Sequence, residues 1–322
     1  MNLPGLHHVT AVTADPVKNY RFYTETLGLR LVKKTVNQDD ISAYHLFYSD
    51  NEGSPGTDMT FFHWPHVSAS RPGPGTIDRT LFLIPSASVD FWRERLAALT
   101  SSADPEEAYD GATVLRFTDF EGQRLGLVTT DSVPEDVATV PGNDVPAEHQ
   151  IRGFASVEIR IAPDWPTGDF LERYLNFSAL SPSVSVGNET VFRYRTGSGV
   201  RGGAAFGDVH LIEDAGATRR GAVGVGGVHH VAYRVPDRET QDAVLSELTS
   251  NGVPTSGLVD RFYFRSVYFR EPGGVLFEIA TDGPGFAVDE NPDTLGASLA
   301  LPPFLESRRS EIEAGLVPLT TG

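Results

Sequence analysis

Two short segments of the chain carry neighbouring histidines in the same context. Gly5-Leu6-His7-His8-Val9 and Gly227-Val228-His229-His230-Val231 hold four of the nine histidines. Asp15 and Asp237 follow the two copies at the same distance. Imidazole is both a common metal ligand and an acid–base group near neutral pH. Because the copies keep one spacing, we interpret them as the same strand of a duplicated unit and expect a metal site between them.

The second histidine of each pair is the better candidate ligand. Alternate residues of a strand share a face, so His8 shares its face with Thr10, and His230 shares its face with Ala232. Two facing strands of this kind offer nitrogen ligands to one ion. A single strand histidine is more often structural, but the duplication favours His8 and His230 as ligands.

A carboxylate completes the candidate ligand set. Glu278 lies in the apolar run Val275–Ala280, just after the turn Glu271–Gly274. An ionised carboxylate in such a strand is costly to bury unless a cation compensates it, and the alternative is a glutamate exposed at a sheet edge. Two imidazoles and one carboxylate form the facial triad that suits Fe(II) and leaves coordination positions open for reacting ligands.

Composition excludes several classes of protein. The 322 residues contain no cysteine, which excludes disulfides and thiolate ligands. The net charge of −17, with lysine only at positions 18, 33 and 34, disfavours nucleic acid as a partner. The sequence has no apolar run long enough to span a membrane. The first residues lack the features of a signal peptide, so we expect a cytoplasmic protein.

The elements that position these residues recur along the chain. A strand from Leu6 to Ala14 leads to a helix that Asp15 caps and Gly28 ends. Three further strands of this βαβββ module are predicted at Leu29–Thr35, Ala43–Ser49 and Asp58–Trp64. The pattern recurs at 76–131, 151–213 and 226–282.

The fourth repeat carries the second histidine pair and Glu278. We predict a helix from Asp237 to Gly252 and strands at Phe262–Tyr263, Ser266–Phe269 and Val275–Ala280. The stretch Asp131–Gln150 is rich in Pro, Asp and Glu, as expected of a linker between domains. The tail from Gly283 is predicted to be extended and to end in a helix near Leu305–Ala314.

These motifs resemble the vicinal oxygen chelate superfamily, which includes glyoxalase I, bleomycin-resistance proteins and extradiol dioxygenases. Within it, four segments resemble the hydroquinone 1,2-dioxygenase type of ring-cleaving enzyme. They are Gly-Leu-His-His-Val-Thr at 5–10, Leu-Gly-Leu-Arg-Leu-Val-Lys-Lys-Thr-Val-Asn at 27–37, Tyr-His-Leu-Phe-Tyr-Ser-Asp at 44–50 and Gly-Val-His-His-Val-Ala at 227–232. The resemblance implies an α+β fold of four βαβββ modules in two glyoxalase-like domains with cupped mixed β-sheets, at 1–140 and 150–322.

The resemblance also implies roles for individual residues. Fe(II), with Mn(II) as the alternative, would be held by His8, His230 and Glu278. Four further residues match active-site positions of the family, where they would move protons or hold the substrate oxygen: His7, His229, Arg261 and Tyr268. Thr10 matches a substrate-binding position.

The chain also departs from the two-domain catechol enzymes of the superfamily, which take all their ligands from the C-terminal half. Module three has Ser156 at the position of a ligand histidine, so the ligands must join modules one and four. Module two has Asp78 or Arg79 near the equivalent place and Leu127 where module four has Glu278, so we expect no second metal site. The remaining histidines, which we interpret as structural or exposed, are His45, His63, His66, His149 and His210.

The favoured function is an Fe(II)-dependent dioxygenase that inserts O₂ into a hydroquinone-type aromatic diol. One alternative is a glyoxalase-like isomerase or lyase, which needs a fourth ligand that the acid-free strand Met59–Trp64 lacks. Others are a catechol extradiol dioxygenase and a metal-free protein that binds a small aromatic. The expected partners are an aromatic substrate, O₂ and a second copy of the chain in a homo-oligomer.

Overall fold

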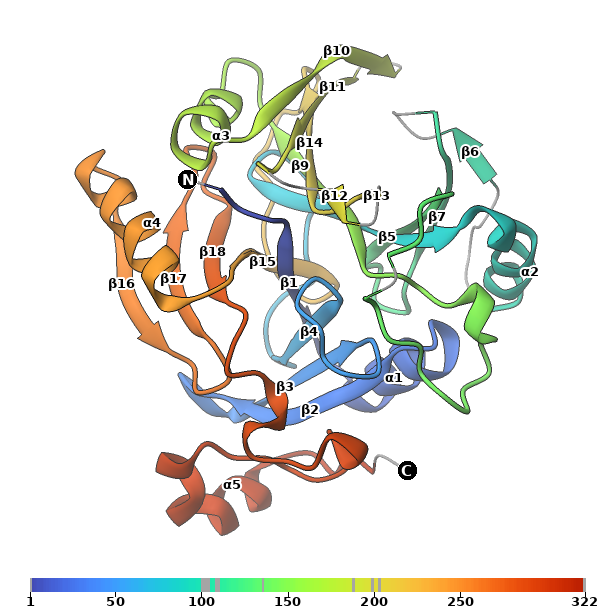
Figure 1. The fold of residues 1–322 in the computed structure, drawn as a ribbon, viewed down its shortest axis with the longest axis vertical. Coiled ribbons are helices and arrows are strands. Elements are labelled where there is room, and N and C mark those ends of the chain that lie inside the picture. The colour runs from blue at the N-terminus through green and yellow to red at the C-terminus, as the bar shows by residue number, and fades with distance from the viewer. Residues whose placement is uncertain are drawn as a thin grey trace.

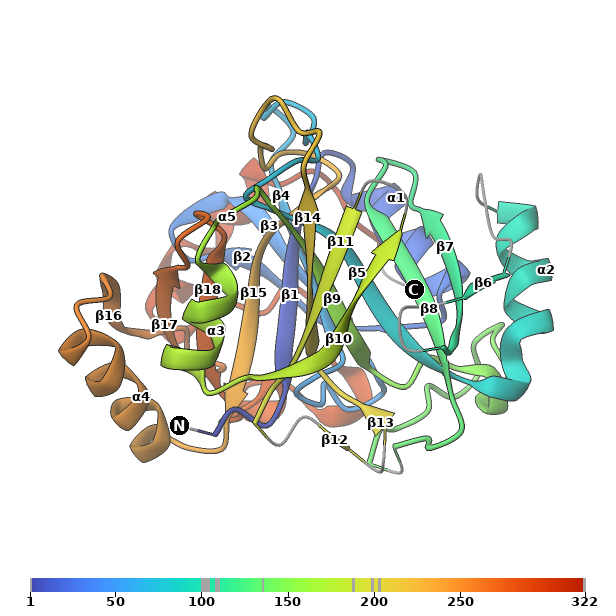
Figure 2. The same ribbon diagram turned by 90° about the horizontal axis from the view of Figure 1, so that it is seen from above.

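Two eight-stranded mixed sheets form most of the molecule (Figures 1 and 2). The computed structural model describes residues 2–99, 105–107, 111–134, 136–186, 189–197, 200–201 and 204–320. The sheets are built from four repeated modules, so the predicted α+β fold with glyoxalase-like modules is confirmed.

The first sheet combines module one with module four, in the order β16-β17-β18-β15-β1-β4-β3-β2. Module one supplies β1 (Leu6–Thr13), β2 (Arg30–Asn37), β3 (Asp40–Ser49) and β4 (Asp58–His63), with α1 (Pro16–Arg21) and a π-helical turn (Phe22–Thr26). Module four supplies β15 (Gly227–Val235), β16 (Thr255–Asp260), β17 (Arg265–Arg270), β18 (Leu276–Thr281) and α4 (Arg238–Ser250).

The second sheet combines module two with module three, in the order β10-β11-β14-β9-β5-β8-β7-β6. Module two supplies β5 (Thr76–Pro85), β6 (Pro105–Glu107), β7 (Thr113–Thr118), β8 (Arg124–Thr130) and α2 (Val89–Leu99). Module three supplies β9 (Phe154–Ile161), β10 (Ser178–Val186), β11 (Glu189–Arg195), β14 (Asp208–Asp214) and α3 (Thr167–Leu175), with the small pair β12 (Val200–Arg201) and β13 (Ala204–Ala205). Each sheet therefore takes one module from either side of the proposed boundary at 140–150.

The repeated aspartates start the helices that follow the repeated strands. The Asp15 carboxylate accepts a hydrogen bond from the Lys18 backbone N–H at 3.0 Å, and Asp237 accepts one from Thr240 at 2.8 Å. Each aspartate thus satisfies one of the N–H groups that have no partner within the helix. Because both helices begin at these caps, each module enters its helix at the same point after the histidine strand.

The predicted strand at Phe262–Tyr263 is wrong. These residues lie in the turn between β16 and β17, and Phe262 has φ of 68°, a left-handed conformation that no strand contains. The strand is instead β16, at Thr255–Asp260, whose residues alternate between half-buried and exposed. Its polar sequence is that of a sheet edge, which sequence patterning detects poorly.

The C-terminal tail packs across β2 and β3 (Figure 1). It contains short 3₁₀ turns at Phe286–Val288, Pro292–Thr294 and Pro303–Arg308 and ends in α5 (Arg309–Gly315). The ammonium group of Lys33, whose side chain is fully buried, pairs with the tail residues Asp289 and Glu290. These ion pairs hold the tail against the first sheet.

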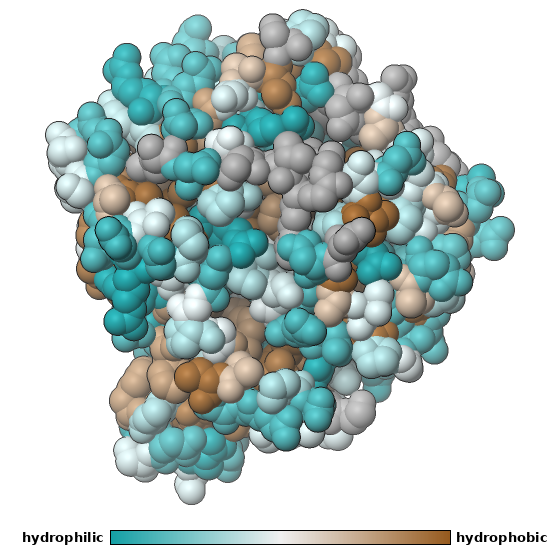
Figure 3. Space-filling view, in the orientation of Figure 1, coloured by the Kyte–Doolittle hydropathy of each residue, from teal (hydrophilic) through white to brown (hydrophobic). Residues whose placement is uncertain are grey.

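The view in Figure 3 shows a largely hydrophilic surface, with apolar side chains gathered at the lower left, above the C-terminal helices of Figure 1. Within the described residues, no helix is both long and apolar enough to cross a bilayer.

A buried carboxylate joins module three to module four. Glu271 accepts hydrogen bonds from the Thr167 hydroxyl at 2.7 Å and from the backbone N–H groups of Gly273 and Val275 at 2.7 and 2.8 Å. Because Glu271→Ala leaves these donors unpaired, we expect it to lower the free energy of unfolding by about 2–4 kcal/mol. Thermal and urea unfolding measure the loss. Glu271→Gln keeps one acceptor oxygen and should lose less stability. If Glu271→Ala is as stable as the wild type, the hydrogen bonds of Glu271 do not stabilise the fold.

Candidate metal centre

The pairing of β1 with β15 skips one residue in each strand. His7 has no opposite partner in β15, and His229 has none in β1. Such β-bulges re-aim side chains. In each pair the two rings consequently meet: the Nδ1 atoms of His7 and His8 lie 2.9 Å apart, and those of His229 and His230 lie 2.8 Å apart.

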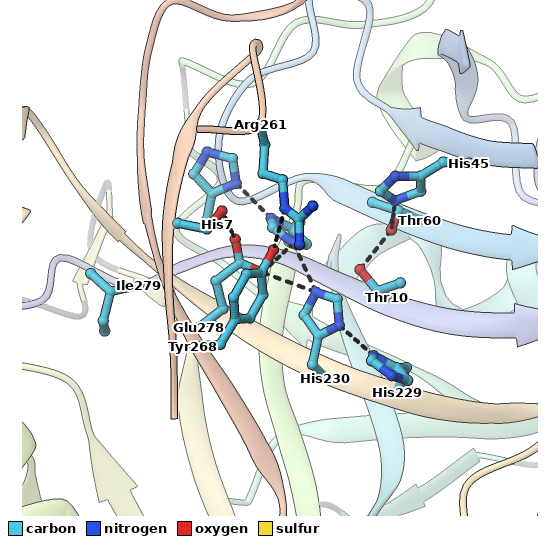
Figure 4. Close-up of polar contacts among 12 residues, drawn as sticks. His7, Thr10, His45, Thr60, His229, His230, Arg261, Tyr268, Glu278 and Ile279 are labelled. Carbon is cyan, nitrogen blue, oxygen red and sulfur yellow. Dashed lines mark hydrogen bonds and ion pairs between the residues drawn. The ribbon is translucent and has the colours of Figure 1, made fainter. Parts of the chain in front are cut away.

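Three ligand-type atoms converge beside this crossing (Figure 4). The Nε2 atoms of His8 and His230 lie 3.2 Å apart, and Oε2 of Glu278 lies 3.2 and 3.0 Å from them. Their side chains are 2%, 4% and 0% exposed. Among the described residues this is the one group of three or more His, Cys, Asp or Glu that meets at metal-binding distance.

The spacing of these atoms suits ligands of a single metal ion. They lie 3.0–3.2 Å from one another, which is close enough for all three to bind one ion about 2.1 Å from each. Oε2 of Glu278 is buried beside the two imidazole nitrogens and has no other hydrogen-bond partner among the described residues, which suits an atom whose lone pair faces a cation. The donor set of two imidazoles and a carboxylate is the facial triad of Fe(II) sites. The residues therefore fit an iron ion.

The electrostatics of the group also suit a cation. Burial opposes ionisation of Glu278, but the neighbouring imidazoles, His8 above all, lower the pKa of its carboxyl well below the usual range. Burial lowers the pKa of His230 and also that of His7, and it lowers the pKa of His229 to about 3. An ionised Glu278 and an uncharged His230 are in the protonation states that bind a metal.

Ser266 fixes the orientation of the carboxylate. Its hydroxyl donates to Oε1 of Glu278, so Oε2 is the oxygen that faces the two imidazoles. Ile279, the next residue of β18, points away from the group (Figure 4). Strand alternation thus buries one side chain on each face of β18.

The open side of the group faces a cavity of about 450 Å³, including its mouth. The cavity is lined by His8 and His230, by the aromatic side chains of Phe47, Phe62, Tyr263, Phe264 and Tyr268, and by polar residues that include Arg261 and His45. Its walls suit a flat apolar molecule with few polar groups.

Arg261 and Tyr268 form a polar wall on the side of module four. The Arg261 Nε–H donates to the Tyr268 hydroxyl at 3.2 Å, and its guanidinium carbon stands 5.3 Å from the centre of that ring. Arg261 also pairs with Asp39 at 2.8 Å, and the Gln38 amide donates to the Arg261 carbonyl. The β2–β3 hairpin of module one therefore closes over a wall of module four.

Two hydroxyls and an imidazole of module one are linked by hydrogen bonds. The Oγ1 atoms of Thr10 and Thr60 lie 2.7 Å apart, and Nε2 of His45 lies 3.1 Å from Thr60 (Figure 4). Thr10 and Thr60 are fully buried and do not line the cavity, whereas His45 does. The proposed contact of Thr10 with substrate stays a prediction.

Thr60 stands where module four has its carboxylate. Thr60 on β4 pairs with Thr10 on β1, as Glu278 on β18 pairs with Ala232 on β15, and Thr10 and Ala232 each follow a ligand histidine by two residues. The position in module one that corresponds to Glu278 therefore carries a hydroxyl, and this hydroxyl contacts Thr10 and His45.

The second sheet repeats the double bulge without the histidines. Asp78 of β5 and Ala155 of β9 are the skipped residues. Arg79 and Ser156 then hold the positions of the two ligand histidines. The strand register places Gly126 where module four has its glutamate, so the prediction of Leu127 there is off by one residue. The group formed by His8, His230 and Glu278 lies in the first sheet, between modules one and four, and its role as a metal site stays a prediction.

The chain belongs to the glyoxalase/bleomycin resistance protein/dioxygenase superfamily, whose profile matches residues 5–127 and 85–279. It is 42% identical to "Putative ring-cleaving dioxygenase MhqA" of Bacillus subtilis (strain 168), over 99% of this chain and 100% of that protein. It is 32% identical to the chlorohydroquinone/hydroquinone 1,2-dioxygenase of Sphingobium indicum, over 97% of each chain.

Solved structures agree with this family. A crystal structure of a "putative dioxygenase" from Bacillus subtilis superimposes with a TM-score of 0.86 at 34% identity, over 99% of this chain and 98% of the other. Glyoxalase I from Zea mays superimposes with a TM-score of 0.61 at 15% identity, over 86% and 92% of the two chains, and shares the fold.

Sequence reasoning missed three residues of this site: His45, Thr60 and Ser266. His45 was grouped with structural or exposed histidines, but β3 places its ring in the cavity wall. His45 and Ser266 hold equivalent positions, since each pairs with the residue two after Thr60 or Glu278. Aligning the strands of modules one and four reveals that equivalence, whereas residue type alone does not.

In the second sheet an ion pair occupies the region that corresponds to the metal-binding group. Arg79 Nε lies 3.2 Å from Oε2 of Glu158, whose side chain is 2% exposed. Burial raises the pKa of Glu158, and Arg79 opposes that rise. We expect Arg79→Met to lower the free energy of unfolding by about 3–5 kcal/mol at pH 8, because it leaves a buried carboxylate unpaired.

The stability lost in Arg79→Met should depend on pH. In Arg79→Met the pKa of Glu158 in the folded state rises further above its unfolded value, so stability falls as the pH rises from 5 to 8. Melting temperatures at the two pH values check this. Arg79→Met/Glu158→Gln should recover most of the loss, and Arg93→Met, at an exposed pair with Asp90, should change little. A loss that is the same at both pH values would refute the explanation.

Proposed function

We propose that this protein is an Fe(II)-dependent ring-cleaving dioxygenase that acts on a hydroquinone-type aromatic diol, with Mn(II) as the alternative metal. The relatives named as ring-cleaving dioxygenases support the reaction, and the relative named for chlorohydroquinone and hydroquinone supports the substrate class. The observation that carries the proposal is the convergence of His8, His230 and Glu278, two of which, His8 and His230, line an aromatic cavity.

The metal ligands come from both ends of the chain. His8 and His230 would each bind through Nε2, and Glu278 through Oε2. Bound there, Fe(II) supplies a redox-active Lewis acid with open coordination positions, where a diol and O₂ can meet. The cavity walls hold the aromatic ring next to those positions and keep bulk water out.

His7 and His229 act through the ligand histidines. A histidine that binds metal through Nε2 carries its proton on Nδ1, and the Nδ1 atom of the preceding histidine lies close enough to accept it in both pairs. Neither His7 nor His229 lines the cavity. Their geometry supports holding the tautomer and the ring orientation of the ligands more than proton transfer with a substrate.

Arg261 and Tyr268 are the groups that would bind the reacting oxygen of the substrate. Both line the cavity, and the Tyr268 hydroxyl accepts from Arg261, which leaves its own proton free to donate. Burial raises the pKa of Tyr268, so the hydroxyl keeps this proton at neutral pH. A guanidinium and a phenol at one wall stabilise negative charge that develops on a substrate oxygen.

The glyoxalase-like alternative finds less support. A fourth carboxylate ligand would stand at Thr60, whose hydroxyl contacts Thr10 and His45. Three ligands leave more of the metal open, as a reaction that also binds O₂ requires. Cytoplasmic location and homo-oligomerisation remain part of the proposal.

We expect His7→Phe and His229→Phe to bind Fe(II) about 10–100-fold more weakly, because an acceptor for the ligand Nδ1–H is lost. Competition with a chelator under argon measures the affinity. His7→Asn keeps an acceptor oxygen on a short side chain, so it should lose less affinity for Fe(II) than His7→Phe. Unchanged affinity together with slower turnover would instead assign these histidines to proton transfer.

The test of the function is oxygen uptake by anaerobically Fe(II)-loaded protein given methylhydroquinone, chlorohydroquinone or catechol. We expect uptake with the hydroquinones, and we expect His8→Ala and Glu278→Gln to lose both uptake and bound iron. His66→Ala, at an exposed histidine, serves as the matched control. No uptake with any diphenol, despite one bound iron per chain, would reject the proposed function.

A further inference from the structure

One imidazole in the cavity wall belongs neither to the candidate metal group nor to the residues that support it. His45 lies on β3, half-buried, and lines the cavity. Its ring is held between two aromatic rings, with centroids 4.0 Å from Phe47 and 4.5 Å from Phe62. Such packing fixes the position of the imidazole in the wall.

Only one nitrogen of this imidazole is engaged. Nε2 lies 3.1 Å from the Thr60 hydroxyl, which also contacts Thr10 at 2.7 Å (Figure 4). Nδ1 forms no hydrogen bond with any residue that the structure describes, although the ring lines the cavity. An imidazole nitrogen that is held rigidly and has no protein partner is available to a ligand.

The polar groups of the cavity therefore come from two sides. Arg261 and Tyr268 belong to module four, and His45 belongs to module one. Module one also lines the cavity with Thr35, Asn37, Gln38 and Asp39. Of these, Gln38 and Asp39 bind Arg261, and the Asn37 side chain accepts a hydrogen bond from the Asp39 backbone. A ring with one oxygen at the metal group and a second oxygen elsewhere on the ring needs a polar partner for each. Module four provides the partners of the first oxygen, and His45 is free for the second.

We infer that His45 determines substrate specificity by binding, through Nδ1, the ring hydroxyl that is not held at the metal group. The inference rests on the proposed function and names what selects the substrate. A para-diol satisfies His45, whereas a catechol has its two hydroxyls on adjacent carbons, both near the metal group, and leaves the imidazole unpaired. His45 is half-buried in the free protein, and a bound ring covers it. A ligand that lacks the matching hydroxyl would then leave Nδ1 without water and without a partner, which disfavours its binding.

The test is a binding cycle with two ligands. Calorimetry under argon on Fe(II)-loaded protein compares hydroquinone with 4-methylphenol, in which a methyl group replaces the second hydroxyl. We expect His45→Phe to bind hydroquinone about 5–20-fold more weakly and to bind 4-methylphenol as wild type does, or more tightly. His45→Gln keeps a polar group near Thr60 but loses Nδ1, so it should also bind hydroquinone more weakly without losing affinity for 4-methylphenol. This variant tests the inference if His45→Phe does not fold.

The outcomes separate the two proposals. An equal loss for both ligands, or no loss for either, overturns the role of His45 while the activity of the wild type stands. Wild-type protein that binds neither ligand and takes up no oxygen overturns the proposed function, and the inference with it. A loss confined to hydroquinone supports the inference.

Discussion

The structure depends on one pairing, that of β1 with β15, which joins the first strand of the chain to a strand more than 200 residues later. Two bulges in this pairing turn His7 and His229 toward the histidines that follow them. Without the bulges, neighbouring residues would point to opposite faces of the sheet, and each pair could offer only one ring to the site. The antiparallel crossing then brings the Nε2 atoms of His8 and His230 to 3.2 Å from each other.

Burying a carboxylate next to this crossing demands a compensating positive charge. The first sheet places Glu278 against two imidazoles, with an arrangement that fits a metal ion, and the second sheet places Glu158 against Arg79. Both arrangements can offset the free energy that is lost when a carboxylate is removed from water. An arginine fills its own site and leaves nothing open, whereas a metal ion keeps coordination positions for other ligands. The same fold therefore supplies structural support from one sheet and a candidate site for chemistry from the other.

Local sequence patterns were enough to predict the modules, because repeated caps and alternating strands depend on nearby residues. The duplicated histidines also predicted which residues would meet, since residue type and repeat carry that information. The edge strand at Thr255–Asp260 was missed because its sequence conforms to no strand pattern. The turn at Phe262 was missed because the aromatic residues Phe262–Phe264 favour a strand. His45 was missed for a different reason. Its place in the cavity follows from the register of β3 against β4, and register is a property of pairing that a single sequence does not display.

The two halves of the site have diverged from a common plan. In module four a serine orients a carboxylate, and at the same positions in module one His45 contacts the hydroxyl of Thr60. A symmetric site would carry a second carboxylate at Thr60, which would occupy a further coordination position and add negative charge. A hydroxyl avoids both effects, and its contact with His45 engages Nε2 of that imidazole. The two modules therefore differ at equivalent positions: module four supplies the carboxylate of the candidate metal group, and module one supplies a hydroxyl and an imidazole.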